Sequence, residues 1–214
     1  MQNVDEILKK MRAAQQAGDP DLIDALRQEY LEIAPSSDLR SDIRYRHGLS
    51  KLFRHQDVSG AMALFKEAAA NKSAPIAPEA RISYALCLRT QQKYTQAIFE
   101  LKKLLPQSAK PNFHTAQALD FLSLIMRESP TVKDAELDAI DQRRVEHLNA
   151  LSEESENPHD KAEWLLRLAA AYSDSGTRSD VNKARQTLQR VIKMGKSAGT
   201  RVKSAREQMK TLAR

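Results

Sequence analysis

Side chains that could support catalysis or hold a metal ion are few in this sequence and lie far apart. None of the five histidines forms a His-x3-His or His-Glu-x2-His pair, the spacings that place zinc ligands on one helix face. Cys87 is the only cysteine, which excludes a cysteine-rich zinc site and an intramolecular disulfide. No glycine-rich phosphate loop or Gly-x-Ser-x-Gly turn is present. We therefore expect a protein that is not an enzyme, with no catalytic residue, no metal site and no cofactor.

Three further features have a plain structural interpretation. Cys87 lies between two leucines of an apolar segment, where a small packing residue is more common than a reactive thiol. Asp134, Glu136, Asp138 and Asp141 follow one another along one predicted helix, and we interpret them as a solvated face rather than a metal site. Trp164 is interpreted as a packing anchor.

Positive charge is concentrated at the C-terminal end. Residues 176–214 hold eleven Lys or Arg and two acids, a net charge of +9, whereas the rest of the chain holds 23 basic and 26 acidic residues, a net charge of −3. Such asymmetry indicates an anionic partner or a solubilising cap. The candidate basic surface consists of Lys193, Lys196, Arg201, Lys203, Arg206 and Lys210. Lys203, Arg206 and Lys210 share one helix face because they are three and four residues apart.

The elements that carry these residues are predicted to be helices in pairs. Gly and Pro are scarce and strong helix formers dominate, while apolar residues recur at helical spacing. We predict an all-α, right-handed solenoid of about five helix-turn-helix hairpins, followed by a C-terminal capping helix, in a single repeat domain that spans residues 1–214. The expected hairpins are 4–34, 38–72, 78–106, 113–153 and 158–195, and the expected capping helix is 200–213. The fourth hairpin has Ala135 in its returning apolar frame and a second helix that looks overlong.

One hairpin carries a recognisable signature, Leu165-x2-Leu168-Ala169-x2-Tyr172-x3-Gly176, and weaker copies precede it. Small residues such as Gly48 and Ala61 recur beside large ones such as Tyr45 and Phe65, which lets paired helices approach closely. The pattern resembles the tetratricopeptide repeat, over roughly residues 42–195. Armadillo-like or other helical-hairpin arrays are the alternative.

The resemblance implies a concave groove, lined by the first helix of each pair, that grips a partner protein. Carried over by position, the groove residues are Arg46, Ser50, Phe53, Arg54, Ile82, Leu86, Arg89, Asp120, Leu124 and Arg127. Arginines among apolar side chains suit an acidic or acidic-apolar segment, because Arg offers bidentate contacts to carboxylates. The alternative is that these residues are only solvated helix faces. Asn is absent from the positions that would clamp a chaperone's C-terminal carboxylate, so that role is not expected.

The function predicted from these features is a non-enzymatic adaptor or scaffold, with the basic end as a second contact surface. Two alternatives stay open, namely nucleic-acid binding through the basic C-terminal helices and self-assembly, so that the oligomeric state is also open. No apolar run approaches the ~20 residues of a membrane span, and no secretory signal is recognisable. We expect no membrane insertion and a cytoplasmic location. The polar stretch at 153–158 is either a joint between subdomains or a long turn.

Overall fold

The computed structural model describes residues 3–106 and 110–212, and every regular element in these ranges is a helix. The chain divides into two compact units, residues 1–101 and residues 102–214. The expected all-α solenoid of helical hairpins is confirmed. Ala213, the predicted end of the capping helix, lies outside the described residues.

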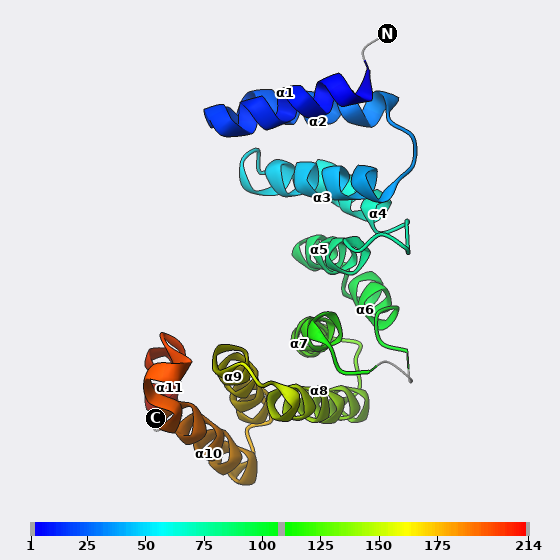
Figure 1. Ribbon diagram of the computed structural model, residues 1–214. Coiled ribbons are helices and arrows are strands. Elements are labelled where there is room, and N and C mark those ends of the chain that lie inside the picture. The colour runs from blue at the N-terminus through cyan, green and yellow to red at the C-terminus, as the bar shows by residue number, and fades with distance from the viewer. Residues whose placement is uncertain (1–2, 107–109, 213–214) are drawn as a thin grey trace. The chain divides into compact units, whose positions relative to one another are not determined.

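The first unit holds three helical hairpins. Its helices are α1 (Val4–Ala17), α2 (Pro20–Ile33), α3 (Asp38–Phe53), α4 (Val58–Ala68), α5 (Ala77–Thr90) and α6 (Tyr94–Lys102), whose last residue already belongs to the second unit. α1 and α2 lie side by side, and α3 packs on α2 (Figure 1). α4 packs on α3, and α5 packs on α4.

Local signals in the sequence determine where these helices begin and end. The side chains of Asn3, Asp19, Ser37 and Asp57 each accept a hydrogen bond from a backbone N–H in the first turn that follows. α1 ends at Gly18, whose φ of 67° lies in the left-handed region that glycine adopts without steric cost. The chain can therefore reverse within two residues and start α2 at Pro20.

A close approach of two helices organises the middle of this unit. Phe65 of α4 is fully buried, and its ring lies over the backbone of Gly48 in α3. A Cβ at position 48 would lie only 2.6 Å from Cε1 of Phe65. Tyr45 packs against the same ring with a centroid separation of 5.6 Å. The predicted pairing of small and large residues thus brings α3 and α4 together.

The second unit holds two hairpins and the terminal helix. Its elements are α7 (Phe113–Glu128), α8 (Asp134–Glu154), α9 (Pro158–Asp174), α10 (Arg178–Met194), the short 3-10 helix η1 (Gly195–Ala198) and α11 (Arg201–Thr211). α8 packs on α7 and α9, and α10 packs on α9 (Figure 1). Within the polar stretch at 153–158, α8 continues to Glu154 and α9 begins at Pro158, with Asn157 as its N-cap. The connection between the two helices is therefore short.

The core of this unit is built mainly from leucines of α8, α9 and α10. Leu148, Leu165, Leu168 and Leu188 are almost fully buried. α11 adds the buried Ala205 and packs on α9 and α10, as the predicted capping helix should. Ala135 is exposed, so the prediction that it packs in the returning frame is wrong. The buried residues of α8, Arg144, His147, Leu148 and Ser152, all lie in its second half.

The described ranges lack two specialised features. No helix there is long and apolar enough to cross a bilayer. No group of three or more His, Cys, Asp or Glu side chains within the same ranges is arranged to hold a metal ion. Cys87 is buried, and burial raises the pKa of its thiol to about 11. The thiol is therefore protonated at neutral pH and unreactive.

Candidate partner-binding surfaces

Two of the predicted groove residues, Ser50 and Arg54, turn towards the preceding hairpin. The Ser50 hydroxyl donates to the buried carboxylate of Asp24 on α2, and Arg54 donates to Asp24 at 2.7 Å and to Asp21 at 2.7 Å. Arg27 also pairs with Asp24, at 3.0 Å. The bonds from Ser50 and Arg54 join α3 to α2 inside the first unit, whereas Arg27 and Asp24 both belong to α2. Ser50 and Arg54 therefore serve the packing of one hairpin on the next.

The environment of Asp24 keeps this carboxylate charged. Burial by itself raises the pKa of Asp24, but hydrogen bonds from Ser50 and His55, together with the charge of Arg27, hold it below its usual value. Burying a charged carboxylate costs free energy unless hydrogen-bond donors surround it, so loss of one of these donors would destabilise the fold. The cluster is thus a connection between α2 and α3 that is sensitive to substitution.

Two further groove candidates, Asp120 and Arg127, take part in a similar network in the second unit. Asp120 of α7 accepts from Arg144 of α8 at 2.6 Å and from Arg167 of α9 at 2.7 Å. Arg127 pairs with Asp141 of α8, which also accepts from the Ser123 hydroxyl at 2.5 Å. These charged side chains hold neighbouring helices together and are already neutralised by partners.

The other predicted groove residues differ in the solvent exposure of their side chains. Ile82 is buried, and Leu86 and Arg89 are half-buried. Phe53 is 74% exposed at the end of α3, and Leu124 of α7 is exposed to a smaller extent. Arg46 is exposed and bonds Asp42 one turn earlier at 2.6 Å. Of the arginines predicted in the first unit, Arg46 is the one that a ligand could recruit most easily.

A shallow groove of about 340 Å³ lies beside Arg46 in the first unit. α1 contributes Leu8, Met11 and Arg12, and α3 contributes Leu39, Ile43 and Arg46. Leu39 is 44% exposed although it is a large apolar residue. Arg12 is exposed and has no acidic partner among the described residues. This groove, called the α1–α3 groove below, combines an apolar floor with two available cations.

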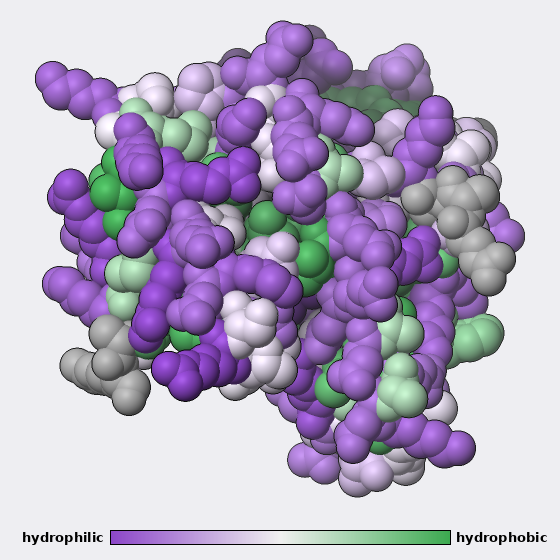
Figure 2. Space-filling view, turned by 90° about the horizontal axis from the view of Figure 1, so that it is seen from below, coloured by the Kyte–Doolittle hydropathy of each residue, from purple (hydrophilic) through white to green (hydrophobic). Residues whose placement is uncertain are grey.

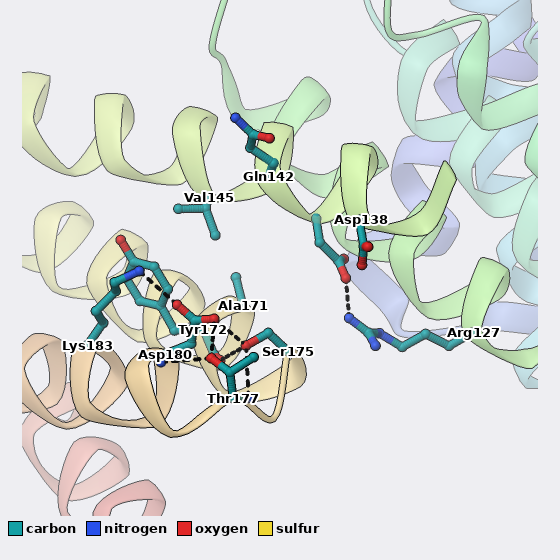
Figure 3. Close-up of a pocket in the computed structure, with 11 residues that line it drawn as sticks. Arg127, Asp138, Gln142, Val145, Ala171, Tyr172, Ser175, Thr177, Asp180 and Lys183 are labelled. Carbon is teal, nitrogen blue, oxygen red and sulfur yellow. Dashed lines mark hydrogen bonds and ion pairs between the residues drawn. The ribbon is translucent and has the colours of Figure 1, made fainter. Parts of the chain in front are cut away.

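A second groove, of about 380 Å³, lies wholly within the second unit. Figure 3 shows Tyr172, Ser175, Asp180 and Lys183 gathered on one side of it and Arg127 on the other. Asp180 accepts hydrogen bonds from Lys183 at 2.8 Å, from Thr177 at 2.7 Å and from Ser175 at 2.7 Å. Lys183, Thr177 and Ser175 together lower the pKa of Asp180 to about 2.

The charges in this second groove largely cancel. Lys183 is neutralised by Asp180 and Arg127 by Asp141, while Asp138 remains exposed at the rim (Figure 3). Val145 and Ala171 add a small apolar contribution. A third hollow, of about 400 Å³, lies between α9 and α11, where Arg201 pairs with Glu163 at 3.3 Å. The second groove thus keeps one uncompensated carboxylate, and both arginines that line the third hollow pair with acids.

Comparison with known proteins identifies the repeat. Residues 52–139 match the family described as Tetratricopeptide repeat. The helical hairpins within this range are similar to tetratricopeptide repeats. The matched range extends from the end of α3 through α4, α5, α6 and α7 to the first residues of α8.

Solved structures with tetratricopeptide-like architecture resemble the chain over most of its length. PilW, described as a widely conserved type IV pilus biogenesis factor, is 18% identical, with 92% of this chain and 82% of that chain covered and a TM-score of 0.58. BtubC (BKLC) from P. vanneervenii is 17% identical, with coverages of 90% and 81% and a TM-score of 0.60. A putative kinesin light chain of Podosopora anserina, with nearly identical TPR-like repeats, is 14% identical, with coverages of 92% and 100% and a TM-score of 0.59. At these identities the likeness establishes the fold alone. Comparison with curated protein sequences gives no match.

The tetratricopeptide repeats end in a strongly basic segment, and the structure shows how its cations are placed. Lys193, Lys196, Lys203, Arg206 and Lys210 are exposed, whereas Arg201 is half-buried beside Glu163. Arg185 is occupied, since it donates to the backbone oxygen of Leu212 at 2.7 Å. Five of the six predicted basic-surface residues therefore point into solvent.

The surface elsewhere carries no large apolar area on the face that Figure 2 displays. Hydrophobic side chains form small separate groups among hydrophilic ones in that view. One aromatic contact is partly open, where Phe113 of α7 meets Trp164 of α9 with a centroid separation of 6.1 Å. Arg167 lies over the Trp164 ring at 4.8 Å. Trp164 thus packs between helices, as its predicted role as an anchor requires.

Sequence reasoning missed the acidic partners of the groove arginines and the whole α1–α3 groove. Asp24, Asp141 and Arg144 lie on the second helices of their hairpins, which the resemblance does not assign to the groove. One signal was available, because isolated charged residues within apolar helix faces usually pair when they become buried. The α1–α3 groove involves the terminal hairpin, whose repeat pattern is the weakest in the chain.

Proposed function

We propose that this chain is a non-catalytic cytoplasmic adaptor whose repeats bind an acidic-apolar segment of a partner protein. Repeats of this kind form scaffolds for protein interaction in general. What supports the more specific proposal is the α1–α3 groove, which the exposed Leu39 and the half-buried Leu8 and Met11 line together with two arginines.

The composition of this groove defines the ligand. Leu8, Met11 and Leu39 offer apolar contact, and Met adapts to side chains of different shape. Arg12 lacks an acidic partner among the described residues, and Arg46 is held only by an exposed pair with Asp42. An exposed pair of this kind contributes at most about 1 kcal/mol, so an incoming carboxylate can displace it. A short segment with one or two acidic residues beside an apolar one matches these groups.

The proposal is tested by comparing what the protein captures before and after charge reversal in the groove. Arg12→Glu combined with Arg46→Glu should abolish capture of a stoichiometric partner from nuclease-treated lysate. Lys66→Glu combined with Lys72→Glu changes the net charge equally at exposed positions outside the groove and should leave capture intact. Equal capture by both variants would exclude the α1–α3 groove as the binding site.

A photo-crosslinking side chain gives an independent check on the location. At Leu39, which lines the groove, it should join covalently to the same partner. At Ile33, which is similarly exposed but does not line the groove, it should not. If the Leu39 probe joins only to a second copy of the chain, self-assembly replaces the adaptor proposal.

A further inference from the structure

The helices α10, η1 and α11 carry a group of unpaired cations. Seven of them have no hydrogen-bond or carboxylate partner within the described parts of the chain, namely Arg178, Arg190, Lys193, Lys196, Lys203, Arg206 and Lys210. Glu207 is the single acid on α11, and Asp180 is already occupied by Lys183. By contrast, Arg127, Arg144 and Arg167 in the same unit all pair with carboxylates.

The fold places these cations on the outer faces of packed helices. Ala205 of α11 and Leu188 of α10 turn inward to the core, which leaves Lys203, Arg206 and Lys210 on the opposite side of α11. α10, η1 and α11 contact one another, so these cations belong to one part of the second unit. With a rise of about 1.5 Å per residue, the three cations of α11 span roughly 10 Å along the helix axis. Several anionic groups of one extended ligand can be contacted together over that length.

The rest of this surface indicates which anionic ligand it suits. None of the large apolar side chains that are exposed in the described residues lies beyond Leu124, so α10 and α11 present no apolar anchor. Protein interfaces depend on aromatic or aliphatic anchors that become desolvated. Helices that lie in a membrane interface carry Trp, Phe or Leu on the face that enters the lipid. A partner recognised by charge and hydrogen bonds alone fits better.

We infer that the outer faces of α10, η1 and α11 bind the phosphate backbone of duplex nucleic acid without reading its sequence. Lys and Arg neutralise phosphates, and the exposed Gln186, Gln189 and Ser204 add donors of the kind that contact phosphate oxygens. Residues 176–214 contain no aromatic side chain, so the surface lacks the stacking platforms of single-strand binders. A duplex needs none, because its bases remain stacked on each other. The inference is independent of the protein partner proposed above.

The test is fluorescence anisotropy with the full chain and a labelled DNA or RNA duplex of about 20 base pairs, between about 50 and 200 mM salt. The logarithm of the affinity should fall linearly with the logarithm of the salt concentration, by about 0.9 for each phosphate neutralised. Combining Lys203→Gln, Arg206→Gln and Lys210→Gln should weaken binding by about tenfold or more. The same change should reduce the slope by about three. Similar affinities for DNA and RNA would assign binding to the phosphates alone. A preference for one would identify which nucleic acid supplies them.

Matched variants make the test decisive. Combining Lys9→Gln, Lys66→Gln and Lys72→Gln removes the same charge from exposed positions in the first unit and should leave both affinity and slope unchanged. The Arg12→Glu, Arg46→Glu variant should still bind the duplex, which separates this surface from the α1–α3 groove. Absence of binding at low salt, a flat salt response, or equal loss with the control variant would overturn the inference. So would tighter binding of polyglutamate, or of vesicles containing phosphatidylserine, through the same three residues.

Discussion

Nε of Arg144 donates to Oδ1 of Asp120 at 2.6 Å, which joins α8 to α7 through a guanidinium that is buried. The same guanidinium reaches α9, because Nη1 donates to Asp174 at 2.6 Å. Burial alone lowers the pKa of Arg144, but Asp120 and Asp174 reverse that effect and raise it. A single charged side chain thus holds three consecutive helices of the second unit in register.

Replacing this side chain should destabilise the second unit. Arg144→Ala leaves Asp174 without its partner and Asp120 with only Arg167, so we expect the free energy of unfolding to fall by about 3 kcal/mol. Urea unfolding followed by the fluorescence of Trp164, which lies in this unit, measures the change. Arg178→Ala, at an exposed position of α10, should shift the transition by less than about 0.5 kcal/mol. Coincident transitions for the two variants would contradict the role given to Arg144.

The contact between Gly48 and Phe65 predicts that Gly48→Ala destabilises the protein, although helix propensity alone would predict stabilisation. Ala is preferred to Gly in a helix by about 1 kcal/mol, yet Gly48→Ala should lower the free energy of unfolding by roughly 1–3 kcal/mol, because its Cβ would overlap the buried ring. Thermal unfolding followed by circular dichroism checks this. Phe65→Leu removes the obstructing ring, so the double variant should lose less stability than the two single changes predict when added. Strict additivity would show that the two residues are not coupled.

The cluster around Asp24 predicts that stability falls with acid. Burial lowers the pKa of His47 below 6.5, Lys51 and Arg27 act in the same direction, and Asp24 opposes them. The pKa of Asp24 itself lies below 3.8. Both groups therefore bind protons more readily in the unfolded chain, and stability decreases as pH falls, first below 6.5 through His47 and then below 3.8 through Asp24.

Substituting His47 isolates its part of this dependence. His47→Gln should make the unfolding midpoint depend less on pH between about pH 7 and pH 5, because no group at this position then takes up a proton on unfolding. His159→Gln, at an exposed position, should leave the original slope. An unchanged slope in the His47 variant would assign the acid sensitivity to other groups.

Arg46 and Arg54 should differ in what they contribute to stability, although the repeat pattern treats them alike. Arg54→Ala removes charged hydrogen bonds to Asp24 and Asp21 and should cost about 1–3 kcal/mol, whereas Arg46→Ala removes only an exposed pair and should cost less than about 0.5 kcal/mol. Chemical denaturation of the two variants compares them directly. Equal losses would show that Arg54 is not a connection between hairpins. Binding tests should therefore vary Arg46 and leave Arg54 intact.

Much of the fold followed from local pattern. The caps at Asn3, Asp19, Ser37 and Asn157 place helix starts where the apolar periodicity also begins, and both depend on residues within a few positions of each other. Ala135 shows where pattern was insufficient, since its spacing suited a core position but its side chain is exposed. Periodicity predicts which residues share a face, and burial also depends on what packs against that face.

The sequence by itself determined that the chain is a series of tetratricopeptide-like hairpins with a basic C-terminal end, because propensity, capping and net charge are local or additive properties. Only the tertiary structure decided which charged residues are available to a ligand. Ser50, Arg54, Asp120 and Arg127 were equal candidates with Arg46 until the fold brought carboxylates, a hydroxyl and guanidiniums of neighbouring helices within hydrogen-bond distance of them. Pairing requires contact across helices that are distant in sequence, and the stacking of hairpins creates that contact.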